Sequence, residues 1–382
     1  MIPVCEGILT GKSYHLESLC QVACSLHPLC VLECVMRKNS FAGIFFLVLL
    51  LGACQPVGTG SPASGMQSLL LTQESKPGSF MNTETGINDN TEVRVLESAE
   101  YEVVERFQIV NHGPGSPSKH NLWAALIRDI PPYQQVMEMS ISTQEYQTFE
   151  DEYGNLIAEF DLSGLAPEKS VVVEIRYLIA VNQLAYDLTK CEGDLPTDFT
   201  NPELYIESYN PQIRSLSTDL SEGKTNPCEQ VRAFYDYVGS NLVYTYNGRD
   251  WGAQAALGEM GADCREYADL MIALSRAAGI PARYLEGLLY LEPATEALAR
   301  SEHAWLEFYL PNVGWTPMDP TLGRSLGLRG KYFAANNPDH IIVTSGRNPS
   351  ALRGASYYTH IYWPGPSAEI KIEDFGWQIK PR

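Results

Sequence analysis

Apolar and polar residues alternate along most of the segment from residue 91 to residue 188, with no helical period. Clusters of Gly, Pro, Asn and Ser separate the alternating runs, as at residues 111–117 and 131–132. Six or seven short strands of this kind are typical of an antiparallel β-sandwich of about a hundred residues. We therefore expect a β-sandwich domain at residues 91–190, with strands at 101–110, 122–130, 135–142, 155–162 and 170–181.

The spacing of apolar residues becomes helical farther along the chain. A polar stretch at residues 201–226 predicts linker and turn, and the residues after it predict a helix over 228–241 with a buried apolar stripe. Thr225 and Asn226 are the candidate caps of this helix. Two further short elements are expected, a strand at 242–246 and a helix at 253–257.

A second amphipathic helix is predicted to begin at Cys264 and to end near residue 278. Gly279 supplies its stop and Pro281 prevents continuation, while Asp269 lies on the polar face. The positive end of the helix dipole stabilises a thiolate at Cys264 over a thiol. The alternative interpretation is that Cys264 is a small buried apolar residue, which is the more common role of a free cysteine.

A hairpin is predicted after a strand at residues 282–291. Residues 303–310 alternate strictly and place His303 on one face, and residues 311–314 form the turn. Opposed residues in a hairpin have numbers that sum to twice the turn centre. His303 and Asp319 centre on 311 and the turn on 312.5, so diagonal pairing or a bulge would bring the two side chains together.

The charge of the chain restricts its partners. Lys and Arg number 27 against 46 Asp and Glu, which gives a formal net charge of −19. Nucleic acid is excluded as an expected partner because so acidic a chain lacks the cations that neutralise phosphates. We expect a protein or peptide substrate and no cofactor.

The N-terminal region predicts export. Met36 begins a basic stretch, residues 41–51 are apolar but too short to span a membrane in the mature protein, and Leu-Gly-Ala-Cys54 follows. This ending resembles a bacterial lipobox, which implies cleavage before Cys54 and a lipid on its sulfur. An uncleaved amphipathic anchor is the alternative. We therefore expect a protein held at a membrane in the cell envelope, outside the cytoplasm, with residues 1–35 as a mis-assigned extension, 36–53 as the signal peptide and 54–90 as a flexible linker.

Export changes the interpretation of the cysteines. The five within residues 1–35 do not have the spacing of a zinc module, so no metal site is predicted there. After Cys54 only three cysteines remain. In an oxidising compartment Cys191 and Cys228 are able to pair, which would leave Cys264 as the free thiol.

Cys264, His303 and Asp319 form a candidate nucleophile, base and orienting residue. Cys264 would attack a carbonyl, His303 would hold the proton and return it to the leaving amine, and Asp319 would orient the imidazole. Taken singly, His303 is also compatible with a hydrogen-bonded sheet residue, and Asp319 with the start of a turn.

Four sequence blocks resemble the core of the transglutaminase-like superfamily. They are Gly261-Ala-Asp-Cys-Arg-Glu-Tyr-Ala-Asp-Leu270, Arg276-Ala-Ala-Gly-Ile-Pro-Ala-Arg283, Glu302-His-Ala-Trp305 and Gly314-Trp-Thr-Pro-Met-Asp-Pro-Thr321. The resemblance covers about residues 225–325. It implies a papain-like α+β fold, in which a helix bearing the cysteine packs on an antiparallel sheet bearing the histidine and aspartate. Cys264, His303 and Asp319 match the triad of the superfamily.

The resemblance also sets domain limits and exclusions. We expect the catalytic domain at residues 200–345 and closing strands at 346–382. The Gly-Gln-Cys-Trp block of animal transglutaminases is Ala262-Asp-Cys-Arg265 here, and no segment matches their calcium loops, so calcium-dependent cross-linking is not expected. The Cys264 backbone N–H is one expected oxyanion donor. Trp251 and Gln254 are candidates for the second.

Two classes of function follow from these residues. The first is a cysteine acyl-enzyme acting on amide or peptide bonds, with hydrolysis favoured because water is always available, and with amine transfer by a true transglutaminase as the alternative. The second is a catalytically silent binding module at the cell surface. The presence of all three candidate triad residues favours the enzyme.

Overall fold

The computed structural model describes residues 93–143, 145–246, 248–258, 261–291 and 302–382. These ranges do not include the predicted extension at residues 1–35, the predicted signal peptide at 36–53, Cys54 or the predicted linker at 54–90. None of the helices in the described part of the chain combines the length and the apolar character needed to cross a membrane.

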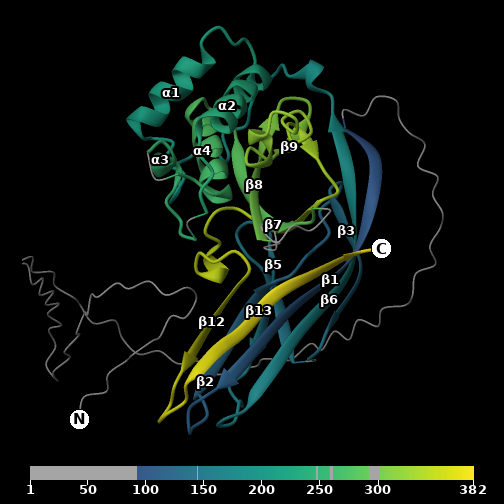
Figure 1. Ribbon diagram of the computed structural model, residues 1–382, viewed down its shortest axis with the longest axis vertical. Helices are drawn as coiled ribbons and strands as arrows, with labels where there is room; N and C mark the ends of the chain where they lie inside the picture. The colour runs from purple at the N-terminus through teal and green to yellow at the C-terminus, as the bar shows by residue number, and fades with distance from the viewer. Residues whose placement is uncertain (1–92, 144, 247, 259–260, 292–301) are drawn as a thin grey trace, which may run out of the picture. The chain divides into compact units, whose positions relative to one another are not determined.

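Two antiparallel sheets pack face to face and form the predicted β-sandwich (Figure 1). One sheet has the order β10-β6-β1-β13, with β3 also paired to β6, and the other has the order β12-β2-β5-β4. Alternate residues of β1, such as Val103, Phe107 and Ile109, are fully buried between the sheets. The first six strands are β1 (Val93–Asn111), β2 (Lys119–Ala125), β3 (Gln134–Ile141), β4 (Tyr146–Glu150), β5 (Leu156–Asp161) and β6 (Ser170–Tyr186).

The last two strands of the chain return to this sandwich. β12 (Tyr358–Trp363) pairs with β2, and β13 (Ile370–Pro381) pairs with β1. β10 (Ala335–Asn336) adds a short pairing to β6. The predicted closing strands therefore complete the sandwich sheets.

The second part of the fold is a four-stranded antiparallel sheet covered by helices. Its order is β11-β7-β8-β9, with β7 (Ala282–Leu289), β8 (Glu302–Leu310), β9 (Gly314–Met318) and β11 (His340–Ser345). The helix α4 (Cys264–Ala277) contacts β7 and β8, and the other helices surround α4 (Figure 1). This arrangement confirms the predicted α+β fold.

The other helices are α1 (Pro211–Ser221), α2 (Pro227–Asn241) and α3 (Ala253–Ala256), with 3₁₀ turns at Leu188–Lys190, Leu322–Arg324 and Ser350–Leu352. The interpretation of residues 201–226 as linker was wrong, because α1 occupies half of that stretch. Asn210 caps α1 through the backbone N–H of Gln212, and Pro211 stands at its first position. Ile213, Leu216 and Leu220 follow helical spacing along α1 and pack against the core, so the sequence did carry an apolar stripe there.

The predicted strand at residues 242–246 was also wrong. The structure forms a single bridge there, between Tyr244 and Ala262. Two apolar side chains of this stretch are exposed to solvent, Val243 by 71% and Tyr246 by 50%. The sequence pattern at residues 242–246 is apolar, but these two side chains are not buried.

Hydrogen bonds join the sandwich to the four-stranded sheet of β7, β8, β9 and β11. The hydroxyl of Tyr133 donates to Glu307 of β8 and to the carbonyl of Trp315, both at 2.9 Å. The side-chain amide of Gln134 bonds both backbone groups of Ile342 in β11, at 2.8 and 2.9 Å. The sandwich thus braces the sheet that carries the candidate histidine.

Candidate active site

Cys264 is the first residue of α4, and the preceding residues fix that helix end. The Asp263 side chain accepts from the backbone N–H of Arg265 at 3.1 Å, and Glu266 accepts from the backbone N–H of Asp263 at 3.0 Å. This capping box gives α4 a rigid beginning. Asp263 therefore acts as a helix cap, and the half-buried Cys264 lies at the positive pole of the helix.

Buried ion pairs hold the polar face of α4. Asp269 accepts from Arg347 at 3.0 Å, and Arg276 lies 2.6 Å from Glu203. The predicted polar face of this helix is buried, because the loop after β11 covers Asp269 and the segment that holds Glu203 covers Arg276. Such pairs fix the helix in one position relative to β11, after which Arg347 follows.

The hairpin of β8 and β9 brings His303 to Asp319. Leu306 pairs with Met318, so the two side chains are diagonal neighbours, as the hairpin arithmetic predicts. Nε2 of His303 lies 2.8 Å from Oδ2 of Asp319. Cys264 lies close enough to this ring to favour its protonated form.

Asp319 also begins a turn. Its Oδ1 accepts from the backbone N–H groups of Thr321 and Leu322 at 2.8 and 3.0 Å. Its own carbonyl accepts from the Tyr235 hydroxyl of α2 at 3.2 Å. One carboxylate oxygen therefore holds the loop, and the other is free to hold the imidazole.

The charges of this group reinforce one another. Burial of His303 opposes its charged form, but the neighbouring Asp319 carboxylate and Cys264 thiolate outweigh burial and raise the pKa of His303 to about 9. Burial of Asp319 likewise opposes its charged form, but His303 and His340 hold the pKa of its carboxyl well below its usual range. At neutral pH the site therefore favours an imidazolium at His303 beside a carboxylate at Asp319.

His340 is a residue that the sequence did not connect with this site. It begins β11, and its Nε2 lies 3.3 Å from the same Oδ2 of Asp319 that binds His303. The sequence offered no signal for this contact, because pairing of β11 with β7 joins segments about fifty residues apart.

His303, Asp319 and His340 are also the one group among the described residues whose side chains lie close enough to hold a metal ion. Their potential ligand atoms lie within 4.8 Å of one another. Hydrogen bonds explain this clustering without a metal. Burial opposes the charged form of His340, but Asp339 and Asp319 raise the pKa of its ring to about 9. The rings of His303 and His340 are therefore both protonated at neutral pH, and a protonated ring nitrogen has no lone pair for a metal ion.

The backbone N–H groups of the two candidate oxyanion donors, Trp251 and Gln254, bind carboxylates in the structure. The backbone N–H of Trp251 donates to Glu266 at 2.9 Å, and that of Gln254 donates to Glu207 at 3.2 Å. Among the described contacts, none links either side chain to Cys264. Both residues stay predictions as donors.

Tyr244 is a third candidate that the sequence did not single out. It bridges to Ala262, two residues before the nucleophile. Burial, and then the charge of Cys264, raise the pKa of the Tyr244 hydroxyl to about 12. The hydroxyl therefore lies within electrostatic range of the sulfur and stays a neutral donor at pH 7.

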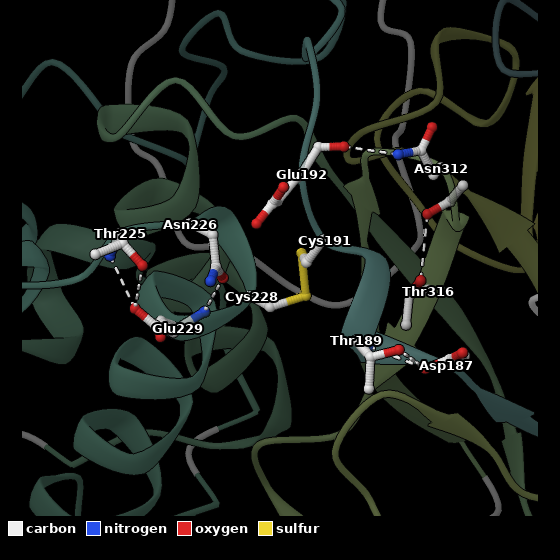
Figure 2. Close-up of a disulfide and its surroundings, with 11 residues drawn as sticks. Asp187, Thr189, Cys191, Glu192, Thr225, Asn226, Cys228, Glu229, Asn312 and Thr316 are labelled. Carbon is white, nitrogen blue, oxygen red and sulfur yellow. Dashed lines mark hydrogen bonds between the residues drawn. A yellow bond between two sulfur atoms is a disulfide. The ribbon is translucent and has the colours of Figure 1, made fainter.

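A disulfide joins Cys191 to Cys228 in α2, with their Cα atoms 6.0 Å apart (Figure 2). Next to it, the side-chain amide of Asn312 in the β8–β9 turn donates to the carbonyl of Glu192 at 2.6 Å. Of the three cysteines in the described ranges, Cys264 is the free one. The predicted pairing is thus the arrangement found in the structure.

Comparison with known proteins assigns a family to the segment that carries these three residues. A family model described as the Transglutaminase-like superfamily matches residues 214–320, the segment that contains α4 and the β8–β9 hairpin. The chain carries a domain of the transglutaminase-like superfamily. Cys264, His303 and Asp319 all lie within the transglutaminase-like domain.

One relative of this domain is named as an enzyme. A protein-glutamine gamma-glutamyltransferase of Pseudomonas aeruginosa is 30% identical over 176 residues, which is 44% of this chain and 25% of that protein. The Bacillus subtilis protein YebA is 29% identical over 147 residues, 33% of this chain and 20% of that protein. This chain therefore spans a quarter or less of the length of these two relatives.

One solved structure resembles the fold of this chain over more than the transglutaminase-like domain. A candidate cysteine protease from Cytophaga hutchinsonii superposes with a TM-score of 0.54 over 76% of this chain and 92% of that chain, at 16% identity. At this identity the likeness concerns the fold.

Proposed function

We propose that this protein is a cysteine acyl-enzyme that acts on amide or peptide bonds outside the cytoplasm. The observation that carries the proposal is the contact of His303 with Asp319 at 2.8 Å, beside a free thiol at the first residue of α4. A nucleophile, a base and an orienting carboxylate in this arrangement are what acyl transfer needs.

The reaction uses each group in turn. The Cys264 thiolate attacks the carbonyl carbon, and the carbonyl oxygen takes the negative charge. The His303 imidazolium then gives its proton to the departing amine as the C–N bond breaks, which leaves a thioester on Cys264. Water attacks the thioester, His303 accepts the proton of that water, and the acid is released. Asp319 holds the ring through Nε2 in both halves of the reaction.

We favour water as the acceptor, because hydrolysis needs no second binding site. Transfer to an amine is the alternative, and the relative named as a protein-glutamine gamma-glutamyltransferase supports it. The chemistry is identical as far as the thioester. The Cys264 N–H, with Trp251, Gln254 or Tyr244, is the proposed oxyanion donor set.

We further propose that the protein is exported and lipid-anchored through Cys54. The disulfide between Cys191 and Cys228 supports an oxidising compartment, since such bonds persist mainly outside the cytoplasm. Intact mass of the native protein tests the anchor. A mature protein that retains residues before Cys54 would contradict it.

A peptide-based thiol-reactive probe tests the catalytic proposal. We expect rapid labelling of the wild type at Cys264 and none of Cys264→Ala. Equal labelling of both proteins would contradict the enzyme and favour a silent binding module.

A second assay separates the two acceptors. A glutamine-containing protein is offered with a fluorescent primary amine, and a peptide library is offered without one. Incorporation of the dye identifies amine transfer, whereas new peptide termini or ammonia release without incorporation identify hydrolysis.

A further inference from the structure

Asp319 is held by two histidines rather than one. Its Oδ2 lies 2.8 Å from Nε2 of His303 and 3.3 Å from Nε2 of His340, and all three side chains are buried. The other ring nitrogen of His340 lies 2.6 Å from Oδ1 of Asp339. An imidazole with a carboxylate at each nitrogen donates at both only when it is protonated, so this geometry specifies an imidazolium.

The Asp339 carboxylate, on the other side of His340, is itself held by hydrogen bonds. Oδ2 of Asp339 accepts from the Tyr332 hydroxyl at 2.9 Å and from Lys331 at 3.2 Å. The ring of Trp305 packs against His340 with centroids 4.8 Å apart, which fixes the plane of His340. The result is a buried row of alternating charge from Asp339 through His340 and Asp319 to His303.

We propose that His340 is a positioning residue, an imidazolium that fixes the Asp319 carboxylate and weakens its hold on the proton of His303. The proposal rests on the roles of Cys264, His303 and Asp319 proposed above. It adds that Asp319 divides its charge between two rings whose centroids are 5.7 Å apart. His303 is then acidic enough to give its proton to a departing amine.

Other charged or titratable groups around His340 come from several elements. They are His303 of β8, Asp319 after β9, Lys331 and Tyr332 of the following loop, Asp339 before β11 and, through Asp319, Tyr235 of α2. Tyr332 and Tyr235 stay neutral at pH 7 because burial and nearby carboxylates raise their pKa values. His340 is thus the second cation on the Asp319 carboxylate.

The test is the pH dependence of Cys264 alkylation by iodoacetamide, followed on the Cys264 peptide of the full chain by mass spectrometry. This reaction needs no substrate turnover. His340→Gln removes the charge but keeps an N–H that is able to donate to Asp319. Because a like charge nearby lowers the pKa of a histidine, we expect the alkaline step assigned to His303 to move up by about one pH unit.

A second test variant and a control variant ensure that the conclusion does not depend on His340→Gln alone. Asp339→Asn removes the countercharge of His340 and should move the same step in the same direction. His360→Gln, which replaces another buried histidine in β12 of the sandwich, is the matched control and should leave the step in place. Circular dichroism verifies that each variant is folded.

The possible pH profiles distinguish a failure of the role proposed for His340 from a failure of the proposed acyl-enzyme function. If the step of folded His340→Gln coincides with that of the wild type, His340 does not act on His303 and the inference is wrong. A reduced plateau rate with an unmoved step would mean a purely structural role and would equally overturn it. A wild-type profile without any step from His303 would instead contradict the proposed acyl-enzyme.

Discussion

Glu105 lies in the core of the β-sandwich and offers a sharp test of its energetics. The residue is fully buried in β1 between Val103 and Phe107, opposite Trp377 of β13. Within the described part of the chain, neither oxygen of its carboxyl has a hydrogen-bond partner. Burial therefore raises the pKa of Glu105 well above its ordinary value, and the folded protein keeps this side chain neutral.

The magnitude follows from linkage between protonation and folding. In the unfolded chain the carboxyl ionises near pH 4.3, and each pH unit above that value lowers the free energy of unfolding by about 1.4 kcal/mol until the folded pKa is reached. Glu105→Gln does not ionise, so its gain in stability over the wild type should be small at pH 4 and should grow by about 1.4 kcal/mol for each pH unit until the folded pKa of Glu105 is reached.

Urea unfolding at pH 4, 5.5 and 7, followed by tryptophan fluorescence, measures this difference. Glu97→Gln is the matched control, because Glu97 lies on the same strand with its side chain exposed, and its curve should follow the wild type. A gain for Glu105→Gln that is equal at all three pH values would refute the reasoning. A loss of stability at pH 7 would refute it as well, since it would reveal a carboxylate that is stabilised in the fold.

Three other predictions concern the active-site part of the chain. Asp319→Asn removes the charge that helps to raise the pKa of His303 to about 9, so the alkaline step in Cys264 alkylation should fall by about two pH units. Cys228→Ser opens a disulfide with a sequence separation of 37 residues and should lower the free energy of unfolding by about 4 kcal/mol in urea titrations without reductant. Gly287→Ala would place a Cβ 2.0 Å from the carbonyl oxygen of Ile341, so β7 and β11 must separate, and the melting temperature should fall by several degrees in calorimetry.

Each of these has its own control. An unmoved step in Asp319→Asn would mean that the carboxylate does not set the proton affinity of His303. Reductant should lower wild-type stability to that of Cys228→Ser, and a remaining gap would point to a cause other than the disulfide. Gly327 has open space around it, so Gly327→Ala should melt like the wild type. Equal melting of Gly287→Ala would contradict the close approach at β7.

The parts of the fold that could be predicted carry their signal locally. The helix that begins at Cys264 is specified by its own cap, period and Gly279 stop, and Gly279 adopts the expected positive φ of 76°. The β8–β9 hairpin is likewise a short-range structure, so the arithmetic of its turn placed His303 near Asp319. The sandwich was predictable because strict alternation needs no knowledge of partners.

The remaining features depend on distant partners. His340 reaches Asp319 only after β11 pairs with β7, and nothing near residue 340 announces that contact. Tyr244 lies in an apolar run that resembles a strand, but the chain there forms one bridge and leaves its neighbour Val243 exposed. For α1, by contrast, both the Asn210-Pro211 start and an apolar stripe from Ile213 to Leu220 were present in the sequence, so this helix could have been predicted.

The return of β12 and β13 to the sandwich has a consequence for folding order. The active-site helices and sheet lie between β6 and these strands in the sequence, so they are an insertion within the sandwich. β1 obtains one neighbour from β6 and the other only from the last dozen residues. A ribosome-bound or partly translocated chain therefore cannot close the sandwich before the inserted part has emerged, and such long-range pairing is slow. Cleavage within the insertion after Cys228 would leave the two parts of the sandwich on separate fragments with no covalent link, whereas the disulfide would still join fragments cut between Cys191 and Cys228.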